Sequence, residues 1–151
     1  MTRPWKPHVT VATVIERDGK YLLVEERDKQ TGAMVFNQPA GHLEQNETLA
    51  AAAERETREE TGWLVELQGI VGIALYTAPA NGVTYHRTTF AGRPLRALEN
   101  ARIDPDIYAV HWLEYEEILA ESARMRSPLV LAAIEQYRRG HCYSLDLIYS
   151  E

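Results

Sequence analysis

The segment from residue 46 to 61 constrains this chain most strongly, because it contains neither proline nor glycine and consists largely of alanine and glutamate. These residue types favour an α-helix. Asn46 is a suitable N-cap, and Glu47 in the first turn would complement the helix dipole. Gly62 stands where a left-handed C-terminal cap favours glycine. The sequence therefore predicts a helix that begins after Asn46 and ends at Gly62.

Three glutamates continue the apolar stripe of this predicted helix. At about 100° per residue, the stripe is Leu49, Ala52 and Ala53, and Glu56, Glu59 and Glu60 fall on the same face. Carboxylates clustered beside a low-dielectric core repel one another and resist ionisation. A hard divalent cation relieves the repulsion, and carboxylate oxygens are the ligands that Mg²⁺ prefers. The pattern thus predicts a site for Mg²⁺, or for Mn²⁺. The alternative without a functional site is a solvent-exposed helix of Glu and Arg.

The spacing of the residues around this helix resembles the Nudix box, G-x5-E-x7-R-E-U-x-E-E-x-G-U, in which U is a bulky aliphatic residue. The fixed positions of the box are filled by Gly41, Glu47, Arg55, Glu56, Glu59, Glu60 and Gly62. Thr57 and Trp63 stand at the two U positions, and neither departure removes a charged group. The complete spacing favours a Nudix hydrolase over the solvated helix.

The resemblance implies a function and a set of roles. Nudix hydrolases cleave the P–O–P link of a nucleoside diphosphate joined to another group. By resemblance, the metal ligands would be Glu56, Glu59, Glu60 and the backbone carbonyl of Gly41. Arg55 would orient a box glutamate, and Glu47 would pack against Arg55. The general base varies within the family, and the candidates outside the box are Glu99, Asp104 and Asp106.

Three further segments resemble a bacterial subgroup of this family, the NudJ-type phosphatases: KPHVTVA near the N-terminus, NQPAGHLE before the box and RSPLV around Ser127. The subgroup acts on nucleoside di- and triphosphates and on thiamine-type pyrophosphates, and it releases orthophosphate. One alternative is a housecleaning nucleoside triphosphate pyrophosphohydrolase, which releases pyrophosphate. Another is a non-catalytic Nudix nucleotide-binding module. An isopentenyl diphosphate isomerase is disfavoured, because Cys142 lies in the C-terminal tail rather than near the sheet.

Several residues outside the box are candidates for substrate binding. Arg87, on a predicted strand, is a candidate phosphate ligand. Phe36 and Tyr76 are candidates to stack on an aromatic ring, although strand aromatics more often lie in a core. His42 and His111 lack metal-ligand spacing, so we expect them to pack or to form hydrogen bonds.

The whole chain of 151 residues has the length of a single domain, 1–151. Its net charge of −6 disfavours a nucleic-acid partner, which leaves a small phosphorylated molecule as the expected substrate. No apolar run is long enough for a membrane span, and the start lacks a signal peptide. The single cysteine is consistent with the cytoplasm. A monomer and a homodimer both remain open.

The remaining pattern predicts an α+β fold, and the resemblance makes this a Nudix αβα sandwich with a mixed sheet between helices. We expect a hairpin of residues 8–16 and 21–25, short strands at 35–38 and 109–113, and a bulged strand at 65–77 that pairs with 85–90. Residues 93–105 read as irregular. Helices are expected at 116–123 and after Ser127-Pro128, the latter ending before Gly140. Its expected apolar stripe is Leu129, Ala132, Ala133 and Tyr137.

Overall fold

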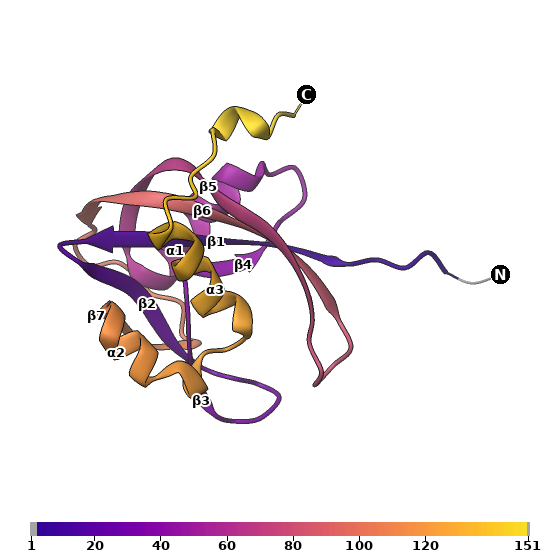
Figure 1. Cartoon of the computed structure of the whole chain (residues 1–151), viewed down its shortest axis with the longest axis horizontal. Coiled ribbons are helices and arrows are strands. Elements are labelled where there is room, and N and C mark those ends of the chain that lie inside the picture. Colours follow the sequence, from indigo (N-terminus) through magenta and orange to yellow (C-terminus); the bar gives the residue numbers. More distant parts are fainter. Residues whose placement is uncertain (1–2, 151) are drawn as a thin grey trace.

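A computed structural model describes residues 3–150 and shows a mixed seven-stranded sheet with helices on both faces (Figure 1). The strands are β1 (His8–Arg17), β2 (Lys20–Arg27), β3 (Met34–Asn37), β4 (Ala40–His42), β5 (Trp63–Thr77), β6 (Thr84–Ala97) and β7 (Ile107–Glu114). The helices are α1 (Leu49–Thr61), α2 (Tyr115–Ala120) and α3 (Pro128–Arg138), with 3₁₀ turns at Ser122–Arg124 and Leu145–Leu147. The predicted αβα sandwich is confirmed.

The centre of the sheet is β1, which pairs with β6 in parallel and with β2 and β4 antiparallel. The predicted hairpin of β1 and β2 is present, and Asp18 and Gly19 form its turn with positive φ angles. β5 and β6 form the second hairpin, and its register shifts at three places, as the bulged strand predicted. The pairing continues to Ala97, so residues 93–97 are strand rather than irregular. Pro94 is tolerated because it lies next to a register shift, where a ladder hydrogen bond is dispensable.

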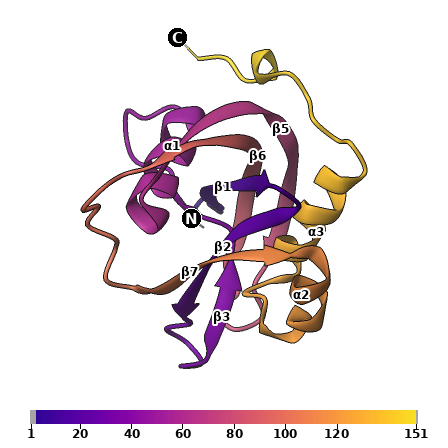
Figure 2. The same cartoon turned by 90° about the vertical axis from the view of Figure 1, so that its left-hand side faces the viewer.

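Each face of the sheet has its own core. Ala52 and Ala53 of α1 pack with Val11, Ile70 and Phe90 on one face. On the other face, Ile118 of α2 and Ile134 of α3 pack with strand residues that include Val14, Leu23 and Phe36. Figure 2 shows α1 separated from α2 and α3 by the strands. Helix α1 is thereby fixed with one face against the sheet.

The start of α1 differs from the prediction. Thr48 is the N-cap, and its side-chain oxygen accepts a hydrogen bond from the Ala51 backbone N–H at 3.0 Å. Asn46 instead adopts a left-handed turn with φ 65°, and Glu47 precedes the helix. The helix starts later because the Glu47 carboxylate turns back to accept from the Glu44 N–H and from Arg55. The end was predicted correctly, since Gly62 caps the helix at φ 74°.

The C-terminal helices also differ in part from the prediction. The helix expected at 116–123 is the short α2 followed by the 3₁₀ turn at Ser122–Arg124. α3 begins as predicted, with Ser127 as N-cap and Pro128 in the first turn. Its buried face is Val130, Ala133 and Ile134, whereas Ala132 is exposed, because the sheet meets a face rotated from the expected stripe. Within residues 3–150, every helix is too short or too polar to cross a membrane.

Candidate active site

A cavity of about 550 Å³ opens where several segments of the chain converge. Its lining comes from the end of β2 and the loop after it, from β4, from the turn between β5 and β6, and from the segment before α3. Among the lining residues are Glu26, Asn37, Gly41, Glu60, Tyr76, Tyr85, Arg87, Asp104, Asp106, Arg126 and Ser127. The cavity therefore brings residues of the box together with cations from distant parts of the chain.

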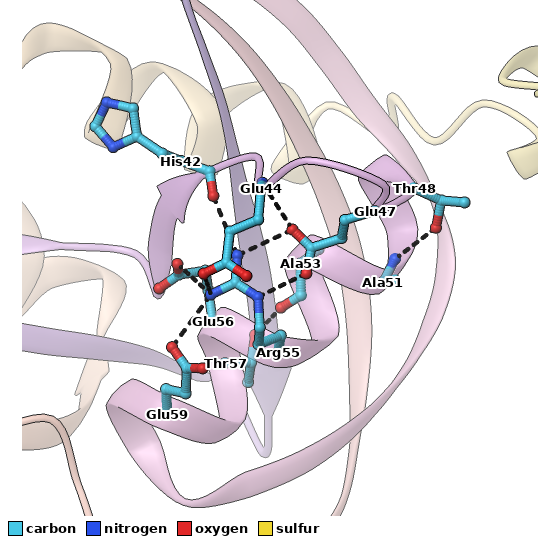
Figure 3. Close-up of polar contacts among 10 residues, drawn as sticks. All are labelled: His42, Glu44, Glu47, Thr48, Ala51, Ala53, Arg55, Glu56, Thr57 and Glu59. Carbon is cyan, nitrogen blue, oxygen red and sulfur yellow. Dashed lines mark hydrogen bonds and ion pairs between the residues drawn. The ribbon is translucent and has the colours of Figure 1, made fainter.

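Arg55 organises the acids next to this cavity (Figure 3). Its Nε and Nη2 donate to both oxygens of Glu47, at 2.6 and 3.0 Å, and Nη2 also donates to the His42 carbonyl. Its Nη1 donates to Glu56 at 2.8 Å and to Glu59 at 3.2 Å. All five N–H groups of the guanidinium thus have acceptors. Arg55 lowers the pKa of Glu47, and the hydrogen bonds that Arg55 donates to Glu47 are the main reason that the pKa of Arg55 rises.

Of the three glutamates proposed as metal ligands, Glu56 lies against Gly41 and Glu60 against Ala40, both on β4. A Cβ at Gly41 would come within 2.2 Å of the Glu56 carboxyl carbon, so only glycine allows this approach. Glu60 is 7% exposed and accepts a hydrogen bond from the Ala40 N–H at 2.9 Å. Burial, together with the charges of Glu26, Glu56 and Asp104, raises the pKa of Glu60 to about 9. Burial also raises the pKa of Glu56. At this end of α1, burial and mutual repulsion disfavour the ionised carboxylates when no cation is bound.

The donor set here suits a hard cation. Glu56 and Glu59 each use one oxygen to accept from Arg55, and Glu60 uses one for Ala40, so each carboxylate retains a second oxygen. Carboxylate and carbonyl oxygens are the ligands of Mg²⁺ and Mn²⁺. Within residues 3–150, no three His, Cys, Asp or Glu side chains surround one point closely enough to form a ready-made metal cage. The chemistry of the donors fits the cation, and binding it requires a rearrangement of side chains.

Arg87, on β6, reaches the cavity from inside the sheet. The residue is 8% exposed, and burial is the main cause that lowers its pKa to about 10, so the guanidinium stays charged at neutral pH. Its Nη2 donates to Asn37 Oδ1 at 3.2 Å and to Gln38 Oε1 at 2.6 Å. Both acceptors are neutral amides. In the described part of the chain, this buried cation in the cavity therefore has no carboxylate partner of its own.

A match to a family model accompanies this geometry. The NUDIX domain model matches residues 5–134, which is most of the chain. The chain belongs to the Nudix hydrolase family. The enzyme class is thereby fixed as a hydrolase of acid anhydrides in phosphorus-containing compounds.

Relatives of this Nudix hydrolase span nearly its whole length. It is 41% identical over 144 residues to Phosphatase NudJ of Escherichia coli strain K12, which covers 95% of this chain and 92% of that protein. A NUDIX hydrolase structure from Nitrosomonas europaea superposes with a TM-score of 0.93 at 44% identity and covers 97% of this chain and 98% of that one. A MutT protein from Methanosarcina mazei Go1 shares the fold, with a TM-score of 0.72 at 20% identity over 91% of this chain and 99% of that one.

The structure of this Nudix hydrolase shows which of the aromatic and acidic candidate residues line the cavity and which do not. Phe36 does not line the cavity, because it is buried in the core, where Arg124 lies over its ring and His111 meets it edge-on. The predicted substrate contact of Phe36 is therefore not supported by its position in the fold. Tyr76 does line the cavity, and so do Asp104 and Asp106, whereas Glu99 is exposed in a turn outside it.

The two histidines have the packing and hydrogen-bonding roles expected of them. His42 meets the rings of His8 and Tyr85 edge-on, at centroid distances of 5.4 and 6.3 Å. His111 forms a 2.9 Å hydrogen bond with Glu25. Tyr85 also lines the cavity, so it adds an aromatic surface that the sequence did not single out.

Sequence reasoning missed several charged residues of the cavity, among them Glu26 and Arg126. Arg126 Nη1 lies 2.8 Å from Glu26 Oε1, and the Glu26 side chain is only 13% exposed. Neither stands out in the sequence, since Glu26 lies near the end of a strand and Arg126 precedes a helix cap. The one available signal was the position of Arg126 directly before the Ser-Pro start of a helix, where backbone N–H groups attract anions.

Proposed function

We propose that this Nudix hydrolase is a divalent-metal-dependent phosphatase. It removes the terminal phosphate of nucleoside di- and triphosphates, with thiamine-type pyrophosphates as further substrates, and it releases orthophosphate. The observation that carries the proposal is the cavity, in which box residues Gly41 and Glu60 share one space with the buried cation of Arg87. The similarity to Phosphatase NudJ over 95% of this chain supports orthophosphate as the product.

The metal site is proposed from the donors already described. Glu56, Glu59, Glu60 and the backbone carbonyl of Gly41 would hold Mg²⁺, with Mn²⁺ as a substitute. When bound, the cation would neutralise phosphate charge and lower the pKa of a water molecule. Arg55 fixes the directions of Glu56 and Glu59, and Glu47 fixes Arg55.

Asp104 is the loop acid best placed to accept a proton. It lines the cavity, and its backbone N–H donates to the Glu59 carbonyl at 2.8 Å, which ties the loop to the end of α1. Its charge also contributes to the raised pKa of Glu56 and Glu60, which reflects its proximity to both. A general base must lie within reach of the attacking water, and Asp104 meets this requirement better than the exposed Glu99.

The time course of phosphorus species tests the proposal. With a nucleoside triphosphate and Mg²⁺, ³¹P NMR should show orthophosphate and diphosphate first, then monophosphate and more orthophosphate. Chelator should abolish turnover, and Mg²⁺ or Mn²⁺ should restore it. Early pyrophosphate would instead identify a housecleaning pyrophosphohydrolase. Full activity in chelator would remove the metal from the mechanism.

A further inference from the structure

The hydrogen bonds of Arg87 leave most of its guanidinium free for a ligand. Only Nη2 donates to other described residues, namely Asn37 and Gln38, whereas Nε is buried without a partner and Nη1 has no recorded acceptor within residues 3–150. A buried donor without an acceptor costs free energy, so its persistence calls for an explanation. The side chain lines the cavity, and an anion in the cavity would supply the missing acceptor.

Arg126 lies at the same cavity, on a segment that is anchored to the sheet. Its backbone N–H donates to the Phe36 carbonyl at 2.8 Å, and Met125 forms a parallel bridge with Phe36. Two residues earlier, Arg124 contacts Glu25 at 2.5 Å and so anchors the segment to β2. These contacts attach the segment before α3 to two strands of the sheet. Arg126 is therefore positioned by backbone contacts and not merely by its own ion pair with Glu26.

The N-terminus of α3 adjoins both arginines. Arg126 directly precedes the N-cap Ser127, and Ser127 and Leu129 line the cavity. Gln38 links the parts, because its Oε1 accepts from Arg87 while its Nε2 donates to the Val130 carbonyl in the first turn of α3 at 2.7 Å. Helix N-termini attract anions through their backbone N–H groups and the helix dipole. Two cations and a helix N-terminus thus meet in one part of the cavity.

We propose that Arg87, Arg126 and the N-terminus of α3 form a binding site for a phosphate group that is not transferred. The inference rests on the proposed function, because it assigns the transferred phosphate to the Gly41 and Glu60 part of the same cavity. It specifies the substrate as a molecule with at least two linked phosphates, of which the inner one is held by the arginines. A monophosphate fills this site without a phosphate left to transfer, so it acts as a competitive inhibitor.

The ion pair between Glu26 and Arg126 gives the proposed site a testable property. Its carboxylate forms the ion pair with Arg126 at 2.8 Å and accepts from Asn37 Nδ2 at 3.5 Å. A phosphate that binds Arg126 competes with this carboxylate and is repelled by its charge. Removal of Glu26 and removal of Arg126 should therefore change phosphate affinity in opposite directions. If the pair were merely structural, loss of either partner would have the same kind of effect.

The test measures binding of inorganic phosphate to the metal-free protein in chelator, by ³¹P line broadening or calorimetry. Arg126→Gln should weaken binding by about tenfold, on the scale of one hydrogen bond to a charged group. Glu26→Gln should strengthen it by a few-fold. A matched control is the pair of Arg93 and Glu66, which lie 3.0 Å apart on the surface outside the cavity. Arg93→Gln and Glu66→Gln should leave phosphate affinity unchanged.

The outcomes distinguish this inference from the proposed function. Absence of phosphate binding to the metal-free parent would overturn the site, while orthophosphate release with Mg²⁺ would still support the proposed function. Equal changes in Arg126→Gln and Glu26→Gln would also overturn it. Should Arg126→Gln fail to fold, as thermal melting would reveal, the gain in affinity of Glu26→Gln decides alone. A nucleoside monophosphate that competes with inorganic phosphate would identify the group as the inner phosphate of a substrate.

Discussion

Arg87 lines the cavity of the candidate active site and Arg55 lies beside it, yet the two arginines have opposite surroundings. Arg55 has acceptors for all five N–H groups, mostly carboxylate oxygens, and this raises its pKa. Within residues 3–150, Arg87 donates to two neutral amides alone, and burial lowers its pKa to about 10. Arg55 therefore acts as a structural clamp for the acids of α1, whereas Arg87 retains a buried Nε donor without a partner, which the proposed phosphate would use. The number of hydrogen bonds already satisfied distinguishes the two roles better than residue type or location.

The same contrast applies to the acids. Glu47 is satisfied by Arg55 and the Glu44 N–H, and its pKa is lowered. Glu60 is buried beside other negative charges, and its pKa is raised to about 9. We expect substitutions of satisfied groups to reduce stability, and substitutions of unsatisfied groups to reduce function.

Glu60→Gln should produce the largest effect. The substitution keeps the shape and leaves an oxygen to accept from the Ala40 N–H, but it removes a proposed metal ligand. Turnover should fall by about 100-fold or more, which is what loss of one electrostatic contact to a transition state typically costs. Steady-state kinetics at saturating Mg²⁺ would measure it. Turnover within a few-fold of the parent would show that Glu60 does not serve the chemistry.

The metal-free Glu60→Gln variant adds a test by pH. The pKa of Glu60 is about 9 in the folded protein, above its ordinary value of 4.5. The contribution of Glu60 to stability is therefore fully present below pH 4.5 and is lost as the pH rises toward 9. Relative to the variant, the parent should melt at progressively lower temperature from pH 5 to 9. A constant difference in melting temperature would mean that Glu60 is satisfied in the folded protein, contrary to the contrast drawn above.

The sequence predicted the acid cluster because its residues lie on one helix. The spacing of Glu56, Glu59 and Glu60 reports their common face directly, and Gly62 marks the end of the helix. The start was missed because Glu47 turns back to Arg55, and this tertiary contact leaves Thr48 as the cap. Local periodicity thus predicts the helix and the common face of its acids well, and the irregular segment before the helix poorly.

The arginine site could be predicted only in part. Arg87 was a candidate on its strand, but its partners Asn37 and Gln38 lie about 50 positions away in the sequence. Arg126 reaches the cavity through a bridge to β3 that has no sequence signature. Phe36 was assigned to substrate because an aromatic residue on a strand can face either side, and only the packing of α2 and α3 shows that it faces the core. Pairing between distant segments decided each of these cases.

Arg55→Leu should have the next largest effect, and it concerns stability. The substitution leaves Glu47 and Glu56 without their cation, and each side chain is no more than 14% exposed. Removal of one partner from such a network should lower the free energy of unfolding by about 2 kcal/mol, somewhat less than for a fully buried pair. Arg58→Leu, on the exposed side of the same helix, is the control and should change it by about 0.5 kcal/mol or less. Urea denaturation of the metal-free proteins would compare them, and equal losses would contradict the role of Arg55 as a clamp.

Arg87→Gln should have the smallest effect on stability and a distinct effect on kinetics. The substitution loses the hydrogen bonds to Asn37 and Gln38, but it also removes a buried charge whose desolvation is only partly compensated, and the two effects offset each other. We therefore expect the free energy of unfolding to stay within about 1 kcal/mol of the parent. The role proposed for Arg87 is to hold a phosphate that is bound equally in the ground and transition states, so KM should rise about tenfold with little change in kcat. A loss of stability as large as that of Arg55→Leu, with KM unchanged, would show that both arginines are clamps and would remove the distinction between them.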